Sequence, residues 1–151
     1  MIKPLFISLI SSSILFIPEK KLETGVYYVK RQQENSTISV YDKLYQTTLY
    51  IDTVAICKKE DFKEATIDTP EYTRNHPVLN VVLTEKGKER FAEATRKSIG
   101  SQLAIFIEGE FIFAPMVQEE IKDGKFQISG GFSMEKITQL KNKLIENPET
   151  N

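Results

Sequence analysis

Tryptophan is absent from this chain, and cysteine and histidine each occur once. The single cysteine excludes an internal disulfide, so the fold depends on its hydrophobic core. Cys57 follows the apolar run 54–56 and precedes Lys58 and Lys59, which leaves two interpretations. Cys57 is either a small apolar residue that closes a buried run, or a thiol made slightly more acidic by the two lysines.

Residues suited to catalysis are also scarce. The lone His76 excludes a metal site built on several histidines, and its Asn-His-Pro context predicts a solvated loop. Glu60 and Asp61 adjoin in sequence and therefore face different ways on a helical turn, unlike a cooperating carboxylate pair. Gly130-Gly131 matches neither glycine-rich phosphate-binding motif and predicts a turn where the backbone passes close to a neighbouring element. We therefore expect a protein that is not an enzyme and has no cofactor and no metal.

Neither sign of charge dominates the chain. Its 20 basic and 21 acidic residues are intermixed and give a formal net charge of -1. No basic stripe is present, which argues against nucleic acid as a partner. With 40% hydrophobic and 27% charged residues, the composition is that of an ordinary globular protein that can bury a sizeable core.

The longest apolar run lies near the N-terminus. Lys3 precedes it, and the apolar and serine residues 4–17 end at Pro18. A positive charge before such a run is typical of a secretory signal, and the run is short for a membrane span. We expect residues 1–21 to be a signal-like segment and linker, no stable membrane span after its removal, and a periplasmic or secreted protein. The alternatives are an uncleaved short anchor or a buried strand.

The pattern of the remaining chain predicts an α+β fold. Runs rich in β-branched and aromatic residues predict strands over residues 24–30, 38–41, 47–52 and 78–83, and residues 58–62 resemble a single helical turn. We expect a single domain over residues 22–147, with a mixed or largely antiparallel sheet in one layer and two helices packed on it in the other. Residues 148–151 are expected to be a frayed tail.

Two helices follow from periodicity and capping signals. Thr84 is the expected N-cap of a helix over residues 85–98, and Gly100 is its stop. The predicted buried face of this helix consists of small residues and one aromatic: Gly87, Phe91, Ala94, Thr95 and Ser98. The second helix starts at Ser133, and its predicted buried side consists of Met134, Ile137, Leu140, Leu144 and Ile145.

A β-hairpin is predicted where two apolar runs flank Glu108-Gly109. A type I′ turn needs positive φ at both central residues, which Gly109 accepts freely and Glu108 accepts at some cost. In the run 103–107 before the turn, both sets of alternating residues are apolar. A strand of this kind is buried on both faces, so we expect it inside a sheet.

The run from Leu79 to Phe132 contains motifs in this order: Leu83-Thr84-Glu85-x-Gly87, Phe91-Ala92-x-x-Thr95, Ile99-Gly100-x-x-Leu103-Ala104-Ile105, Glu108-Gly109, Ala114-Pro115-x-Val117-Gln118-Glu119 and Gln127-Ile128-Ser129-Gly130-Gly131-Phe132. Through these motifs the run resembles the head subdomain of the first periplasmic domain of SecD, the accessory subunit of the bacterial Sec translocon in the SecDF protein-export family. Two positions depart from the family pattern, because Phe113 replaces a small polar residue and Glu108 replaces Asp. The resemblance implies the fold of the head and its binding of unfolded polypeptide, but not proton-driven translocation.

The apolar arm after the turn is the candidate site. Either the two helices cover both of its faces, or Phe111, Phe113 and Met116 border an exposed apolar groove beside an edge strand, which suits unfolded polypeptide. Our leading hypothesis is a non-enzymatic domain in protein export that binds polypeptide or an envelope protein partner at these residues. The second hypothesis is a structural or assembly module that oligomerises through the apolar hairpin arm.

Overall fold

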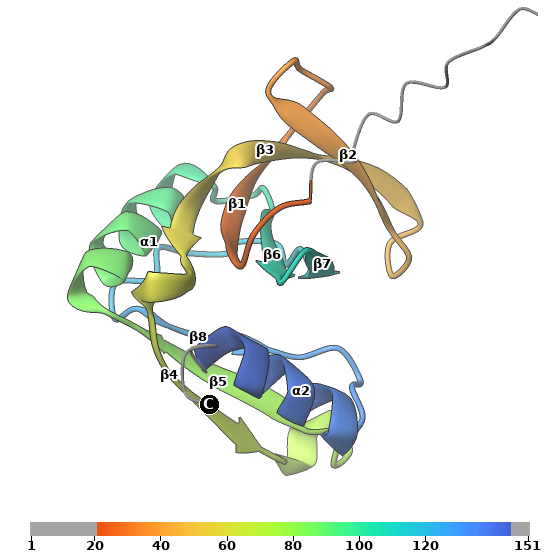
Figure 1. Cartoon of the computed structure of the whole chain (residues 1–151), viewed down its shortest axis with the longest axis vertical. Coiled ribbons are helices and arrows are strands. Elements are labelled where there is room, and N and C mark those ends of the chain that lie inside the picture. Colours follow the sequence, from red (N-terminus) through yellow and green to blue (C-terminus); the bar gives the residue numbers. More distant parts are fainter. Residues whose placement is uncertain (1–20, 146–151) are drawn as a thin grey trace, which may run out of the picture.

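The computed structural model describes residues 21–145, which form eight strands and two α-helices (Figure 1). The strands are β1 (Gly25–Lys30), β2 (Thr37–Asp42), β3 (Thr47–Lys58), β4 (Phe62–Asp68), β5 (Val78–Leu83), β6 (Leu103–Ile107), β7 (Glu110–Phe113) and β8 (Lys125–Ile128). The helices are α1 (Glu85–Lys97) and α2 (Met134–Ile145), with short 3-10 turns η1 (Lys59–Asp61) and η2 (Glu71–Thr73). Except for Lys21, the expected signal-like segment lies outside the described residues, as does the expected tail.

The strands form two antiparallel sheets, so the predicted α+β class with antiparallel strands is confirmed. The large sheet has the order β2-β3-β1-β6-β7, and the small sheet has the order β4-β5-β8. We expected one sheet, and the difference arises at η1, where the chain leaves β3 and starts β4 in a separate ladder (Figure 1). The residues after Asp52 also continue β3 to twelve residues, so this strand is longer than predicted.

The main core lies between the two sheets and the helices. It collects one side of β6 (Leu103, Ile105 and Ile107) together with apolar residues of β4, β5, α1 and α2. The other side of β6, Ala104 and Phe106, faces a second core under β1 and β3. All five residues of β6 are buried, and β6 lies between β1 and β7, as predicted from its two apolar faces.

The large sheet curves around the second core. The β1–β3 register shifts on both sides of Tyr27, and shifts of this kind bend a strand. As a result, β2 and the first half of β3 extend away from both helices (Figure 1). Leu49 and Ile51 of β3 contact the second core together with Tyr27, whose hydroxyl donates a hydrogen bond to the Glu23 carbonyl at 2.9 Å.

Both helices begin at side-chain caps. The Thr84 hydroxyl accepts a hydrogen bond from the Gly87 N–H at 3.2 Å, and the predicted buried face of α1 is confirmed. The Ser133 hydroxyl accepts one from the Lys136 N–H at 3.2 Å, and α2 packs mainly on β4 of the small sheet. In α2 the predicted burial of Ile137, Leu140 and Leu144 is confirmed, and Ile145 is half-buried. The prediction for Met134 is wrong, because this first residue of α2 is 51% exposed one turn ahead of Ile137.

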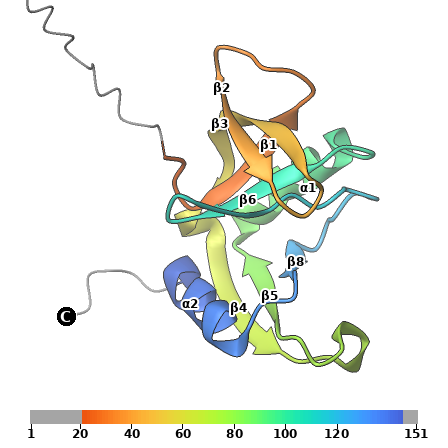
Figure 2. The same ribbon diagram turned by 90° about the vertical axis from the view of Figure 1, so that its right-hand side faces the viewer.

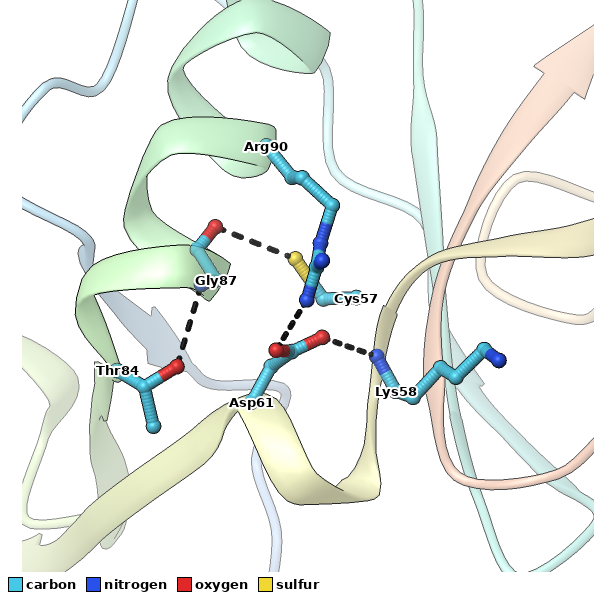
Figure 3. A network of polar contacts seen from close by, with 6 residues as sticks. All are labelled: Cys57, Lys58, Asp61, Thr84, Gly87 and Arg90. Carbon is cyan, nitrogen blue, oxygen red and sulfur yellow. Dashed lines mark hydrogen bonds and ion pairs between the residues drawn. The ribbon is translucent and has the colours of Figure 1, made fainter.

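A buried polar network connects the two sheets at η1 (Figure 3). The Asp61 carboxylate accepts a hydrogen bond from the Lys58 N–H at 2.8 Å and pairs with the Arg90 guanidinium of α1. The Asp61 carbonyl accepts another from the Thr84 N–H at 2.8 Å. A Cβ added to Gly87 would lie 2.8 Å from the Asp61 Cβ, so glycine lets the first turn of α1 approach η1 closely.

Cys57 lies beside this network and is fully buried. Its thiol donates to the Gly87 carbonyl at 3.6 Å. Burial raises the pKa of the Cys57 thiol to about 12; Asp61 adds to the increase and Arg90 opposes it. The interpretation as a small apolar residue is therefore confirmed, and the interpretation as an acidic thiol is wrong because burial removes the solvation a thiolate needs.

Candidate binding groove between the two sheets

The hairpin that carries the predicted site is confirmed. Glu108 has φ 48° and Gly109 has φ 81°, so both central residues of the turn have positive φ. The Glu108 N–H donates to the Thr24 hydroxyl at 3.0 Å. Helix α2 holds the same turn through two ion pairs, from Lys136 to Glu110 at 2.6 Å and from Lys143 to Glu108 at 3.6 Å.

A β-bulge after the turn changes which side chains share a face. Phe106 pairs with Phe111 and Ile105 pairs with Phe113, so Ile112 is the extra residue on β7. Phe111 therefore lies in the second core, with its ring 5.6 Å from that of Phe106, while Phe113 lies at the main core. Simple alternation predicts that Phe111 and Phe113 share a face, and this prediction is wrong because of the bulge.

An apolar groove of about 320 Å³ opens beside Phe113. The large sheet, α1, β8 and the connection from β7 to β8 all contribute to its walls. The lining residues are Val26, Phe91, Thr95, Leu103, Ile105, Phe113, Pro115, Met116, Val117, Gln118, Glu119, Ile121, Phe126 and Gln127. Of the three residues predicted to bind, Phe113 and Met116 line the groove and Phe111 does not.

Aromatic packing forms the inner wall of the groove. The Phe126 ring from β8 lies 5.1 Å from that of Phe91 on α1. Next to them, the Thr95 hydroxyl donates to the Phe91 carbonyl at 2.9 Å and accepts from the Ile121 N–H at 3.0 Å. These bonds attach the β7–β8 connection to α1, so the groove has a defined wall on that side.

Two sheet edges come close to the groove. Strand β7 is the last strand of the large sheet and β8 is the last strand of the small sheet. Figure 2 shows the β7–β8 connection descending from the level of β6 to β8, on the side of β5 away from β4. Within residues 21–145, β7 pairs only with β6, so its other edge has no strand partner. An extended chain could pair with such an edge through its backbone.

Several groove residues are not among those that the sequence predicts to be functional. Ile121 and Phe126 are apolar residues in an otherwise polar stretch, and this isolation is the signal that could have identified them. Phe91 is predicted to be buried in the helix face, where it is 5% exposed, yet it also lines the groove. Glu119 belongs to the motif after Pro115, which suggests no separate role for it.

The other residues weighed for chemistry lie apart from the groove. His76 is exposed in the loop after η2, where its backbone N–H donates to the Thr73 carbonyl at 3.1 Å. Asp61 is buried and Glu60 is exposed, so the two carboxylates do not face the same way. Gly130 and Gly131 form a turn before α2. The three atoms nearest to a Cβ on Gly130 all belong to the adjacent Phe132 ring, and a Cβ on Gly131 would meet nothing within 4 Å, so the predicted close approach to another element is wrong.

Two further findings describe residues 21–145. No group of three or more His, Cys, Asp or Glu side chains in this part of the chain is placed to hold a metal ion. In the same range, neither helix has the length and apolar character needed to span a membrane.

The fold defines a known class of domain. Its arrangement resembles a solved structure described as "Structure and function of a membrane component SecDF that enhances protein export", with a TM-score of 0.59 and 20% identity over 81% of this chain and 62% of the other. SecDF in its Super-membrane-facing form gives a TM-score of 0.58 and 20% identity, over 80% of this chain and 18% of that one. At this identity the likeness shows an α+β head fold of the SecDF type.

Sequence comparison identifies the family. Residues 34–147 match the family described as "SecDF, P1 head subdomain", so the chain belongs to it and the predicted resemblance is confirmed. Protein translocase subunit SecD of Sebaldella termitidis is 43% identical over 68 residues, which are 45% of this chain and 17% of that protein. The SecD of Treponema pallidum is 32% identical over 118 residues, 74% of this chain and 20% of that protein. The chain thus spans about a fifth or less of these relatives.

Proposed function

We propose that this chain binds extended, apolar segments of unfolded polypeptide during protein export at the cell envelope. The observation that carries the proposal is the apolar groove of about 320 Å³ beside Phe113 and Met116. The relatives support the setting, because they are protein translocase subunits and one solved neighbour is described as enhancing protein export. The role is non-enzymatic, since apolar contact needs no reacting group.

The groove suits varied sequences rather than one defined ligand. Phe113 and Phe126 provide broad apolar surface, and the flexible side chain of Met116 adapts to side chains of different shape. Backbone pairing along the free edge of β7 would add affinity without depending on sequence. A segment that is already folded could offer neither its apolar side chains nor its backbone.

The proposed location is the periplasm or the exterior of the cell. Two observations support it: the signal-like pattern of residues 1–21 and membership of a family of periplasmic head subdomains. The proposed ligand would then be a polypeptide that emerges from the export machinery, and an envelope protein is the other candidate partner.

Binding can be measured by fluorescence anisotropy of a labelled, unstructured peptide of about twelve residues rich in Leu and Phe, titrated with the full chain. Met116→Glu places a charge at the groove and should weaken binding roughly tenfold or more, because the charge loses water when an apolar ligand covers it. Met134→Glu is the matched control, since Met116 is 49% and Met134 is 51% exposed and Met134 does not line the groove. Equal binding by both variants and the wild type would refute the proposal.

The second hypothesis, assembly through the hairpin arm, has less support. The Phe111 side of the arm already packs in the second core of its own chain. Light scattering separates the two hypotheses, because assembly predicts a dimer or larger species that Phe113→Asp dissociates. The groove proposal requires no such species.

A further inference from the structure

The rim of the groove carries a negative charge. Among the residues of the range 21–145 that line the groove, Glu119 is the one with a charge, and the others are apolar or neutral polar. It lies on the β7–β8 connection, which the Thr95–Ile121 hydrogen bond attaches to α1. Its position relative to the apolar wall is therefore set by the fold.

The Glu119 carboxylate is exposed and has no ion-pair partner within residues 21–145. Its neighbour Glu120 is different, because Lys122 lies 3.7 Å from that carboxylate and Glu120 does not line the groove. A ligand that covers the apolar wall would remove part of the water around Glu119. A cation on the ligand would replace that water favourably, whereas a second carboxylate would be repelled.

We infer that the groove selects extended polypeptide segments in which apolar residues are followed closely by a lysine or arginine. Glu119 forms an ion pair with this basic residue. The inference rests on the proposed polypeptide-binding function and names its substrate class. Charge complementarity supports it: an apolar surface bordered by one free negative charge fits an apolar segment bordered by one positive charge. Glu119 acts on specificity, and the apolar wall provides most of the affinity.

The test uses three labelled peptides with the same apolar core of Leu and Phe, ending in Lys, Gln or Glu, each titrated with the full chain at low and at physiological salt. The wild type should bind the Lys peptide about two- to fivefold tighter than the Gln peptide, the size expected for a largely exposed ion pair, and the Glu peptide more weakly. The preference should shrink as salt rises.

Two variants test whether Glu119 causes the preference for the Lys peptide. Glu119→Gln should bind all three peptides with similar affinity, because the charge that distinguishes them is gone. Glu120→Gln makes the same change in net charge one residue away and should keep the preference of the wild type. Circular dichroism checks that both variants fold, as expected because Glu119 is exposed and Glu120 is on the surface connection.

The outcomes separate this inference from the function it rests on. If all peptides bind the wild type equally, or if Glu119→Gln keeps the preference, the charge selection is refuted while the groove function stands. If no peptide binds, both proposals fall. Loss of the preference in Glu120→Gln would also overturn the assignment, because the effect would then follow net charge rather than the groove rim.

Discussion

The carboxylate of Asp61 is buried at the junction of the two sheets, whereas the guanidinium of Arg90 that pairs with it is half exposed: their side chains are 4% and 49% exposed. Asp61 thereby joins η1, at the end of β3, to α1 (Figure 3). Helix α1 also provides one wall of the groove. This pair therefore helps to determine how the two sheets that flank the groove lie relative to each other.

Asp61→Ala should lower the free energy of unfolding by about 2–4 kcal/mol, because the Lys58 N–H loses its acceptor and Arg90 loses its partner. Arg90→Ala should cost a comparable amount, because it leaves the buried Asp61 carboxylate without its counter-charge. Asp61→Asn keeps the size and one acceptor but removes the charge, so it should cost less than either. Urea denaturation measures all three. Little change in both Asp61→Ala and Arg90→Ala would show that this pair does not stabilise the junction.

Gly87→Ala tests the close approach of α1 to η1. In an exposed helix position this change stabilises by up to about 1 kcal/mol, because alanine favours the helix. At position 87 the new Cβ would lie 2.8 Å from the Asp61 Cβ and 3.1 Å from the Asp61 carbonyl oxygen, and the latter is backbone that cannot rotate away. We expect steric overlap to exceed the propensity gain and to destabilise the protein by about 1–3 kcal/mol.

The control for helix propensity is Glu89→Ala, at an exposed position of the same helix. It should change the free energy of unfolding by less than about 0.5 kcal/mol in thermal or urea denaturation. If Gly87→Ala instead behaved like this control, η1 and α1 would have room to separate.

Cys57 should be unreactive in the folded protein. Its thiol is buried and keeps its proton up to a pKa of about 12, so 5,5′-dithiobis(2-nitrobenzoic acid) at pH 8 should react only after unfolding in guanidinium. Rapid reaction of the native protein would contradict the buried position.

The same raised pKa makes stability depend on pH in the alkaline range. The folded state holds the Cys57 proton up to about 12, whereas a solvated thiol, as in the unfolded chain, has a pKa of 9.0. The unfolded state therefore gains free energy by ionising first, and this contribution to stability is complete below pH 9 and lost as pH rises towards 12. Urea denaturation at about pH 7, 9 and 10 should show a decline above pH 9 that is smaller in Cys57→Ala.

Local features of the fold could be predicted from sequence, and long-range pairings could not. The Thr84 cap and the Glu108-Gly109 turn depend on residues within a few positions of each other, so the local pattern indicates them. The small sheet depends on β8 pairing with β5 across more than forty residues, and no local pattern encodes that choice. For the groove, Met116 could be predicted because it follows the hairpin. The shift of Phe111 to the second core depends on the bulge at Ile112, which alternation does not reveal.

The turn itself gives the last prediction. Glu108 has φ 48°, a conformation that Asn adopts more readily than Glu, so Glu108→Asn should relieve about 0.5–1 kcal/mol of backbone strain. The same change removes the ion pair with Lys143, at 3.6 Å between side chains that are 49% and 42% exposed. Such a pair contributes about 0.2–0.5 kcal/mol, less than the strain, so the net effect should be a small stabilisation.

Lys143→Ala isolates the ion pair, because it removes the same contact and leaves the turn unchanged. It should destabilise the protein by no more than about 0.5 kcal/mol in urea denaturation. Gly109→Ala should instead destabilise by about 1 kcal/mol or more, since φ is 81° there and a Cβ disfavours that conformation. If Glu108→Asn lost more stability than Lys143→Ala, then the Glu108 side chain would stabilise the hairpin through more than its pair with α2, and this stabilisation would outweigh the backbone strain at the turn.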